Sequence, residues 1–487
     1  MKEKKREVRK PTFVEAVIPI LFMAIVLVAG KGILKWPTEV CLLLAAVFAG
    51  IVAILRLGYT WSDLEKFIVD KIAAVMPPVL IVVFVGFMIG AWCFAGTLPM
   101  LVYYGMKFIS PSVVLFASFI ATAILSYVSG ASWGAAASIG VALMGVGTGL
   151  GVPPAMTAAA VVTGAYFGDK LSPLSDTTNL ASACTRVPLY DHIKYMLWTT
   201  IPSTIITLIF FLILGKGLNI AGEVSSSSLA MLDQLSSLFK FGIWPLIPMI
   251  VILVATFLRF PTVPAMLLSA VSAIVIGVFY QGLDLNQGLT ATMTGFDVSM
   301  LGVDASTLQP EILELLNRGG LANNGSFLAL IFCAMGFAGI LTGTGMMDVA
   351  MGQLTHMIKS CGIAVLVSEA MCILINLLTG SDGLNKIITT EVLMKKFLEL
   401  RIHPIVLCRS LEDSGTMTGP IIPWSAAGLY MATTLGVATL DYLPYCLLCF
   451  LSLLFGLFYA FTGIKIRRIT DEEAHEMARE RGITLDN

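Results

Sequence analysis

A strongly polar segment interrupts two apolar stretches, and it limits what this chain can fold into. Residues 165–185 read Ala-Tyr-Phe-Gly-Asp-Lys-Leu-Ser-Pro-Leu-Ser-Asp-Thr-Thr-Asn-Leu-Ala-Ser-Ala-Cys-Thr. Charged residues at membrane depth are rare, and they usually face a protein interior or mark an ion path. A broken backbone is tolerated there only where it is buried or lines a cavity. The segment therefore predicts a binding site inside a membrane protein.

The composition supports a membrane location. The 487 residues are 57% hydrophobic and 13% charged, whereas soluble domains carry about 25% charged residues. Apolar runs recur from Phe13 to Phe461, which leaves no room for a separate soluble domain. The first ten residues hold six Lys or Arg, and no Ala-x-Ala-like site follows, so we expect no cleaved signal. A net charge of −1 gives no indication of nucleic-acid binding.

An ordered series of short matches indicates an internal duplication. Trp36-Pro37-Thr38 matches Phe260-Pro261-Thr262, Gly86-Phe87 matches Gly336-Phe337, Ser129-Gly130-Ala131-Ser132 matches Thr379-Gly380-Ser381-Asp382, and Gly168-Asp169-Lys170 matches Glu412-Asp413-Ser414. Each match is weak alone, but the order is the same in both halves. The duplication predicts that each half contributes one hairpin tip and one interrupted helix.

The number of spans decides how the halves are related. A span needs about 20 apolar residues. If 111–148 crosses twice, each half has six spans and the halves are parallel; if it is a re-entrant hairpin, each half has five and the second half is inverted. The five-span topology puts the Lys and Arg clusters on the side of the basic N-terminus, and the loops 215–241 and 281–325 on the other side. We therefore predict an all-α polytopic membrane protein of ten spans, with a second hairpin at 361–400.

The boundaries follow from this topology. We expect a cytoplasmic N-terminus at 1–12, a first repeat at 13–214, an extracytoplasmic linker at 215–241, an inverted second repeat at 242–464 and a cytoplasmic tail at 465–487. Within the first repeat the spans are expected near 13–30, 38–56, 79–96, 153–186 (interrupted at 168–179) and 190–214. Residues 57–78 are amphipathic and indicate a helix at the membrane interface.

Inverted repeats with broken helices are typical of secondary transporters, whose sites lie near the membrane midplane. Four polar breaks are expected to converge there, at 129–134, 168–179, 379–385 and 412–423. Their hydroxyl, carboxylate and carbonyl oxygens are hard ligands that suit Na⁺. The candidate ion- and proton-binding residues are Ser129, Ser132, Asp169, Asp176, Thr177, Asn179, Asp382, Asp413, Ser414 and Thr416, with Asp169, Asp176 and Asp413 as Na⁺ ligands.

A buried carboxylate can couple the movement of Na⁺ to that of H⁺. Burial disfavours the charged form of the group, whereas a bound cation favours it. Sodium binding then expels a proton, and proton binding expels sodium. One site that holds either ion, but never both, is sufficient for antiport by alternating access. Asp169 and Asp176 are the first candidates for this switch, followed by Asp413 and Asp382.

Other roles are open for the same residues. Asp169 could be only an ion-pair partner, Asp176 and Asp382 could cap half-helices, and Asp413 could lie in a cytoplasmic loop. A channel is a rival class, but it needs neither paired broken helices nor a carboxylate switch.

Two patterns argue against metal-dependent and enzymatic functions. All four His are expected to be solvated, and no His or Cys lies in a polar break, so we expect neither zinc or copper transport nor a cofactor. Residues 130–134 read Gly-Ala-Ser-Trp-Gly and fit a serine-hydrolase elbow. That chemistry needs a His base, and none is expected at membrane depth. We therefore expect a transporter and no enzyme.

Two motifs resemble those of NhaC-type Na⁺/H⁺ antiporters, a family within the ion transporter superfamily. They are Ser129-Gly-Ala-Ser-Trp-Gly134 and Gly168-Asp-Lys-Leu-Ser-Pro-Leu-Ser-Asp-Thr-Thr-Asn179. The resemblance covers nearly the whole chain. It implies exchange of Na⁺ (or Li⁺) for H⁺ across a bacterial inner membrane, with Asp169, Asp176 and their hydroxyl neighbours in ion binding. It also implies a scaffold, a mobile transport domain with elevator-like motion, and a homodimer in the lipid bilayer.

One alternative stays open within the family, which also contains carriers that exchange malate and protons for lactate and Na⁺. Lys170, Lys386 and Arg409 could hold a carboxylate group of such a substrate. Carboxylates equal or outnumber cations at the polar breaks, which favours a site for cations alone.

Overall fold

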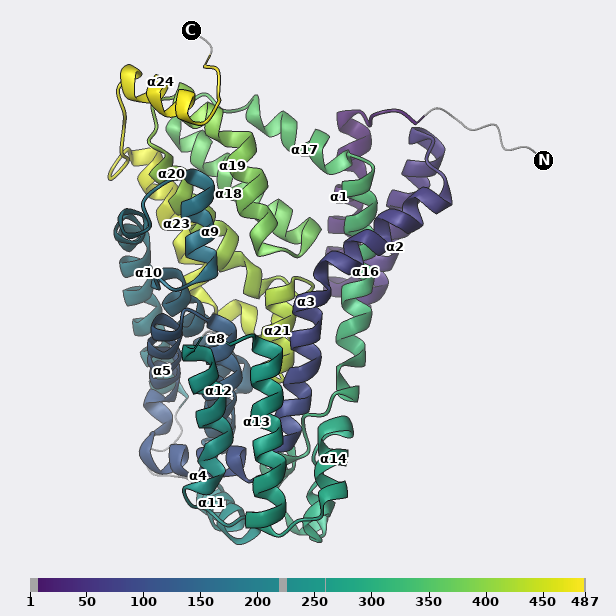
Figure 1. Ribbon diagram of the computed structural model, residues 1–487, viewed down its shortest axis with the longest axis vertical. Coiled ribbons are helices and arrows are strands. Elements are labelled where there is room, and N and C mark those ends of the chain that lie inside the picture. Colours follow the sequence, from purple (N-terminus) through teal and green to yellow (C-terminus); the bar gives the residue numbers. More distant parts are fainter. Residues whose placement is uncertain (1–7, 219–225, 259, 486–487) are drawn as a thin grey trace, which may run out of the picture.

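The computed structural model describes residues 8–218, 226–258 and 260–485, and most of them are helical (Figure 1). The first half contains α1 (Phe13–Val26), α2 (Thr38–Val52), α3 (Trp61–Phe94), α4 (Thr97–Phe108), α5 (Val114–Ser129), α6 (Ser132–Ala135), α7 (Val141–Gly149), α8 (Pro154–Leu171), α9 (Asp176–Thr185) and α10 (Leu189–Gly217). The all-helical polytopic class predicted from the sequence is thus confirmed.

The second half likewise consists of helices of different lengths. It contains α11 (Ser226–Leu238), α12 (Ile247–Phe257), α13 (Thr262–Ile276), α14 (Leu285–Thr294), α15 (Pro310–Leu316), α16 (Gly325–Gly343), α17 (Met346–Thr355), α18 (Cys361–Thr379), α19 (Asp382–Glu399), α20 (Pro404–Ser410), α21 (Ala426–Leu435), α22 (Thr439–Tyr442), α23 (Leu447–Thr462) and α24 (Asp471–Glu480). Short π-helical segments extend several of them: η1 (Leu27–Ile33), η2 (Ala53–Leu57), η4 (Ala136–Gly140), η6 (Gly277–Gln281) and η10 (Leu411–Thr416).

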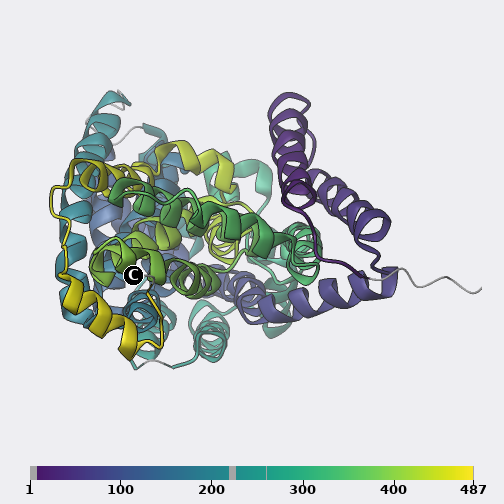
Figure 2. The same cartoon turned by 90° about the horizontal axis from the view of Figure 1, so that it is seen from above.

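Helices α1 and α2 form an antiparallel pair at one side of the molecule, where α2 packs against α16 and α1 against α17 (Figure 2). Helix α1 begins at a capping box, in which the Thr12 hydroxyl accepts from the backbone N–H of Glu15 and the Glu15 carboxylate accepts from that of Thr12. The Glu15 carboxylate also binds Arg9 at 2.5 Å and Arg56 at 3.2 Å. These contacts join the beginning of α1 to the end of the α2–η2 helix.

Helix α3 differs from the prediction. The amphipathic segment 57–78 was expected to form its own interfacial helix, but it continues without a break into the following span as one helix of 34 residues. A capping box between Thr60 and Asp63 starts this helix. Pro77 and Pro78 lie inside it and lack the N–H groups that would bond the preceding turn, which allows the helix to change direction rather than to end.

Two hairpins reach into the molecule, and each turns at a glycine in the left-handed region. Gly130, with φ of 68°, joins α5 to α6, and Gly380, with φ of 64°, joins α18 to α19. Left-handed backbone carries no steric cost for glycine. In Figure 1, α5 lies in the lower half of the molecule, whereas α18 and α19 lie in the upper half. The inverted relation of the two halves stays a prediction.

Close packing of α5 against α8 sets the position of the first interrupted helix. Gly164 and Gly168 lie four residues apart on α8, so both face α5. A Cβ on Gly164 would be 2.3 Å from the carbonyl oxygen of Phe119, and one on Gly168 would be 2.2 Å from that of Ala123. Small residues with this spacing let helix backbones approach closely in membranes. The packing holds the polar end of α8 beside the hairpin tip.

The breaks are shorter than expected. The predicted interruption at 168–179 is confined to residues 172–175, so Asp169 and Lys170 lie in the last turn of α8 and Asp176 begins α9. In the second half, Glu412 and Asp413 lie in the π-helical turn η10, and α-helix resumes at α21. Polar residues can remain helical at such a break, either at the end of a helix or in a π-helical turn. The composition of the segments does not show where the helix ends.

Within the described residues, seven helices are long and apolar enough to cross a membrane, or nine if each sharply bent pair counts as one span. Two of the seven, Pro111–Ser129 and Cys361–Thr379, are the first arms of the predicted re-entrant hairpins, which the ten predicted spans do not include. The number of spans and the domain boundaries therefore stay predictions. Residues 1–7 of the predicted N-terminus, 219–225 of the linker, 259 within the second repeat, and 486–487 of the tail lie outside the described residues.

Candidate functional site

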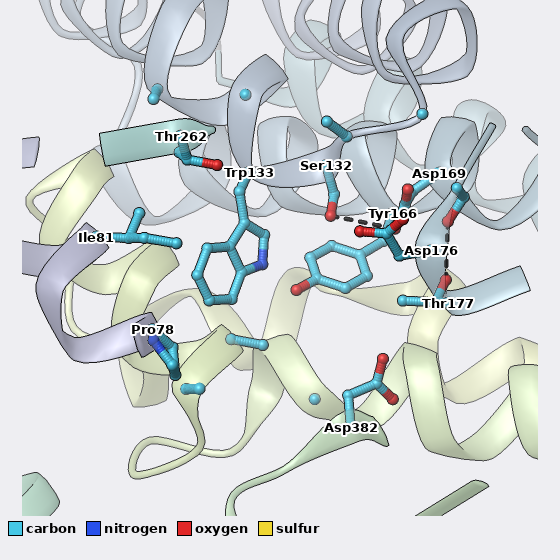
Figure 3. Close-up of a pocket in the computed structure, with 18 of the residues that line it drawn as sticks. Pro78, Ile81, Ser132, Trp133, Tyr166, Asp169, Asp176, Thr177, Thr262 and Asp382 are labelled. Atoms are coloured by element: carbon cyan, nitrogen blue, oxygen red, sulfur yellow. Dashed lines mark hydrogen bonds between the residues drawn. The ribbon is translucent and has the colours of Figure 1, made fainter. Parts of the chain in front are cut away.

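All four polar breaks contribute to the lining of one cavity of about 670 Å³ (Figure 3). The polar side chains of its lining are Ser129, Ser132, Tyr166, Asp169, Ser175, Asp176, Thr177, Thr256, Thr262, Asn376, Ser381, Asp382, Thr416 and Ser425. The turn between α12 and α13 and part of α3 supply apolar walls. Three carboxylates line the cavity, and none of its described lining residues is Lys, Arg or His.

Asp169 lies in the last turn of α8 and is almost fully buried, at 3% exposure. Its Oδ2 accepts a hydrogen bond of 3.2 Å from the hydroxyl of Ser132, at the N-terminus of α6 (Figure 3). Behind it, the hydroxyl of Thr178 donates to the carbonyl of Lys170 at 3.0 Å and bridges the break. The carboxylate therefore faces the hairpin tip, with capacity left for a cation or a proton.

The second half of the polar segment divides between cavity and turn. Asp176 is exposed and lines the cavity as the first residue of α9. Thr177 also lines it, and its hydroxyl lies 3.0 Å from that of Ser175. Asn179 does not line the cavity: its amide donates to the carbonyls of Ser175 at 2.7 Å and Pro173 at 3.0 Å. Asn179 thus closes the turn that separates α8 from α9.

Asp413 lies away from the cavity, in a buried ion-pair cluster. Its Oδ1 binds the ammonium group of Lys170 at 2.5 Å and accepts from the hydroxyl of Thr199 at 2.9 Å. The Nε atom of Arg409 is 3.7 Å from its Oδ2. Asp413 is 0% exposed and lies in the helical turn η10, so it is not part of an exposed loop. Ser414 also points elsewhere, since its hydroxyl donates to the carbonyl of Ser410 at 2.6 Å.

A second ion-pair cluster reaches the cavity through Asp382. This residue lies in the first turn of α19, across the cavity from Ser132 and Asp169 (Figure 3). Its Oδ1 binds the ammonium group of Lys386 at 2.7 Å. Lys386 also lies 3.7 Å from the carboxylate of Glu412, which is 0% exposed. Lys386, like Lys170, is thereby held in ion pairs behind the cavity wall.

Two further predicted ligands line the cavity in different states. The hydroxyl of Ser129 donates to the carbonyl of Leu125 at 2.8 Å, so it is engaged with its own helix. The hydroxyl of Thr416 is buried and has no hydrogen-bond partner among the described residues.

Several polar residues of the cavity wall were not among the predicted site residues: Tyr166, Thr256, Thr262, Asn376 and Ser425. Asn376 in α18 lines the cavity and donates to the carbonyl of Gly415 at 2.7 Å, while its own oxygen accepts from Asn385 at 2.6 Å. The rings of Trp133 and Tyr430 stack at 4.3 Å, and the Tyr430 hydroxyl donates to the carbonyl of Trp133. An Asn within an apolar helix was a usable sequence signal for Asn376. The stacking of Trp133 on Tyr430, 297 residues away in the chain, leaves no signal in the sequence.

The expectation of solvated His side chains is wrong for two of the four. His192, in the first turn of α10, is 0% exposed, and neither ring nitrogen has a hydrogen-bond partner among the described residues. His403 is 8% exposed, and its Nδ1 accepts from the backbone N–H of Ile405 at 3.0 Å, which caps α20. Helix ends near the surface are buried here by packing of neighbouring helices. The hydroxyl of Ser132, the hydrolase candidate, binds Asp169 and no His.

The known proteins that resemble this chain are transporters. A model of the Na⁺/H⁺ antiporter family matches residues 164–464. A protein named an uncharacterized Na(+)/H(+) antiporter, from Haemophilus influenzae, is 39% identical over 95% of this chain and 98% of its own length. The Na(+)/H(+) antiporter NhaC of Alkalihalophilus pseudofirmus is 36% identical over 88% and 90%. A malate-2H(+)/Na(+)-lactate antiporter of Bacillus subtilis is 34% identical over 94% and 96%.

The family match covers more than half of the chain, and the similarity to these relatives extends over nearly all of it. The resemblance of the two motifs, which predicted an NhaC-type transporter and no enzyme, is confirmed. The chain belongs to the Na⁺/H⁺ antiporter family.

Proposed function

We propose that this protein exchanges Na⁺ (or Li⁺) for H⁺ across the cell membrane by alternating access. The observation that carries the proposal is the charge of the cavity, whose described lining holds Asp169, Asp176 and Asp382 and no cationic side chain. A cleft lined by one sign of charge concentrates the opposite ion. Carboxylate and hydroxyl oxygens in its wall are the ligand type that hard cations prefer.

Asp169 is the proposed switch of the exchange. Its burial disfavours an uncompensated negative charge, so the group holds either a proton or a cation. Because Lys170 is paired with Asp413, the neighbouring ammonium group is not available to neutralise Asp169. Sodium that binds Asp169 with the Ser132 hydroxyl releases the proton to the side on which the cavity is open. After the carrier turns, a proton from the other side displaces the sodium.

Asp382 and Asp176 have supporting roles in this proposal. Asp382 faces Asp169 across the cavity and is already paired with Lys386. Asp176 is exposed and lines the cavity, where it attracts cations without the desolvation that a buried switch requires. Thr416 offers the buried free hydroxyl as a further sodium ligand. Asp413 contributes indirectly, by holding Lys170 away from the ion.

A second candidate is coupled exchange of an organic acid, as the name of the Bacillus subtilis relative describes for that protein. The size of the cavity favours it, since 670 Å³ is within the range of about 300–1,000 Å³ seen for small-molecule sites. The charge argues against it. Lys170 and Lys386 are engaged in ion pairs, and neither lines the cavity, so a substrate carboxylate lacks a cationic partner.

The cellular setting is part of the proposal. Helix α24 and the turn between α19 and α20 lie at the same end of the molecule, where Arg401 binds Asp471. With the positive-inside rule, this end faces the cytoplasm of a bacterial inner membrane, and both termini lie there. The resemblance to the ion transporter superfamily supports a homodimer with an elevator-like transport domain.

Everted membrane vesicles test the function. Respiration acidifies their lumen, and addition of Na⁺ should dissipate the pH gradient with no organic acid present. Vesicles without the protein are the control. A response that appears only with malate or lactate would favour the organic-acid candidate, and no response to Na⁺ or Li⁺ under either condition would remove the proposal.

A further inference from the structure

Lys386 lies between two carboxylates that differ in their access to the cavity. Its ammonium nitrogen is 2.7 Å from Oδ1 of Asp382 and 3.7 Å from Oε1 of Glu412. Asp382 lines the cavity, and its side chain is 25% exposed. Glu412 is 0% exposed, and neither carboxylate oxygen has a hydrogen-bond partner among the described residues. One anchor of Lys386 is therefore accessible to an entering ion, and the other is not.

The pair formed by Lys170 is different in kind. Its partner Asp413 also accepts from Thr199 and lies beside Arg409, and the guanidinium of Arg409 is in turn held 4.8 Å from the ring centroid of Tyr195. All of these groups lie behind the cavity wall. Lys170 is thus fixed by partners that all lie away from the cavity. Lys386 instead has a second carboxylate, that of Glu412, at 3.7 Å.

We propose that Lys386 is a tethered cation that competes with the transported ion for Asp382, and that Glu412 is its alternative anchor. This inference rests on the proposed function. When Na⁺ occupies the cavity beside Asp382, the ammonium group moves to Glu412; when Na⁺ leaves, it returns. Lys386 stays charged throughout, so no bond is made or broken. The ammonium nitrogen of Lys386 is 2.7 Å from Asp382 and 3.7 Å from Glu412, so a small movement of this group exchanges one partner for the other.

The exchange of partners keeps Lys386 and Asp382 compensated in both states, and Glu412 stays within 3.7 Å of the ammonium group even in the sodium-free carrier. A buried carboxylate without a partner is strongly destabilising. In the sodium-free carrier Lys386 neutralises Asp382, and in the sodium-bound carrier it neutralises Glu412. The flexible four-carbon stem of lysine allows this, whereas a planar guanidinium would favour one fixed geometry. The apparent sodium affinity is therefore a balance between Na⁺ and Lys386 at Asp382.

Two substitutions should shift that affinity in opposite directions. Lys386→Met removes the competitor and should lower the half-saturating Na⁺ concentration for dissipation of the pH gradient in everted vesicles. Glu412→Gln removes the alternative anchor and leaves Lys386 on Asp382, so it should raise the half-saturating Na⁺ concentration. Each shift should be roughly fivefold or more, as is typical of coupling between sites. The double variant should resemble Lys386→Met, because Glu412 acts only through the lysine.

Lys396→Met is the matched control. Lys396 lies on the same helix, α19, and pairs with Glu399 at 2.7 Å, but its side chain is 38% exposed. Removing this charge should leave the sodium dependence unchanged. All measurements are made at one pH, with protein amounts determined by immunoblot.

The outcomes separate this inference from the function on which it rests. Absence of any Na⁺ response in the wild type removes the function. A normal wild type with shifts of the same sign, or none, in Lys386→Met and Glu412→Gln overturns the competition. If Lys386→Met does not accumulate, Glu412→Gln decides alone, and an unchanged or lowered half-saturating concentration contradicts the inference. If only the double variant accumulates, the pair is structural and the inference falls.

Discussion

Gly168 offers a test of whether helix packing positions the ion switch. In Gly168→Ala the new Cβ would lie 2.2 Å from the carbonyl oxygen of Ala123 and 2.7 Å from the backbone nitrogen of Tyr127. Both are backbone atoms of α5, so no side chain can rotate to relieve the overlap. The two helices must separate at this point.

The required separation determines the size of the effect. Ordinary contact begins at 3.4 Å, so α8 must move from α5 by about 1 Å. Overpacking of this kind costs about 1–3 kcal/mol of stability. The neighbouring Asp169 moves with α8, and its 3.2 Å bond to Ser132 then exceeds hydrogen-bonding distance. A hydrogen bond to a charged group contributes about 1.5–3 kcal/mol, so the half-saturating Na⁺ concentration should rise roughly tenfold or more.

Everted vesicles and thermal unfolding in detergent measure the two effects separately. Gly336→Ala is the control, since Gly336 lies inside α16 and a Cβ there has no heavy atom within 4 Å. It should leave both measurements near those of the wild type. If Gly168→Ala accumulates and retains the wild-type sodium dependence, the contact between α5 and α8 does not hold Asp169 in place, and the reasoning from packing to function is wrong.

Three further predictions concern other parts of the site. Asp176→Asn should weaken Na⁺-dependent proton movement less than Asp169→Asn does, because Asp176 is exposed; equal loss in the same vesicle assay would contradict this. Lys170→Met and Asp413→Asn should each destabilise the fold by about 3–5 kcal/mol, and the double variant by less than their sum, as thermal unfolding in detergent should show; strict additivity would mean that the two groups do not pair. Burial, together with nearby Arg side chains, lowers the pKa of His403 to about 4. The unfolded chain takes up this proton near pH 6.5, so the fold should lose stability as pH falls from about 6.5 to 4. His403→Asn keeps a capping acceptor and should reduce this loss of stability when unfolding is measured as a function of pH. An unchanged pH dependence would exclude His403 as its source.

The positions of the breaks could be predicted because the membrane restricts polar groups so strongly. Asp169 and Asp382 interrupt apolar sequence, and such residues must face a protein-lined space. Both line the cavity. Gly130 and Gly380 marked the hairpin tips for a similar reason, since a tight reversal between two helices favours a residue that adopts positive φ.

The partners of the charged residues could not be predicted. Asp169 and Lys170 are adjacent, which suggested a local ion pair, but successive side chains on a helix do not face each other. Lys170 instead binds Asp413, which is 243 residues away in the chain. Spacing along the sequence carries no information about such a contact. The assignment of Asp413 as a direct sodium ligand rested on its place in the repeat, and the structure puts a lysine there.

Burial at helix ends was the other point that patterns along the chain could not supply. His192 follows a proline near the start of a predicted span, where a solvated position is usual, yet it is fully buried. The burial of His192 depends on neighbouring helices, and the sequence around His192 does not indicate which helices pack against it. The continuity of α3 is similar: an amphipathic pattern indicated an interfacial helix, but that pattern does not show that the helix continues through Pro77 and Pro78 into the span.

The central claim is that the cavity around Asp169 exchanges Na⁺ for H⁺ without an organic substrate. Its most direct test is uptake of radioactive Na⁺ into proteoliposomes that contain the purified protein and carry an imposed pH gradient, acidic inside. The account predicts rapid uptake by the wild type in a buffer free of organic acids and amino acids, and no gradient-driven uptake by Asp169→Asn at equal protein amount. Uptake that requires malate, lactate or another organic solute, or uptake by Asp169→Asn at the wild-type rate, would contradict it.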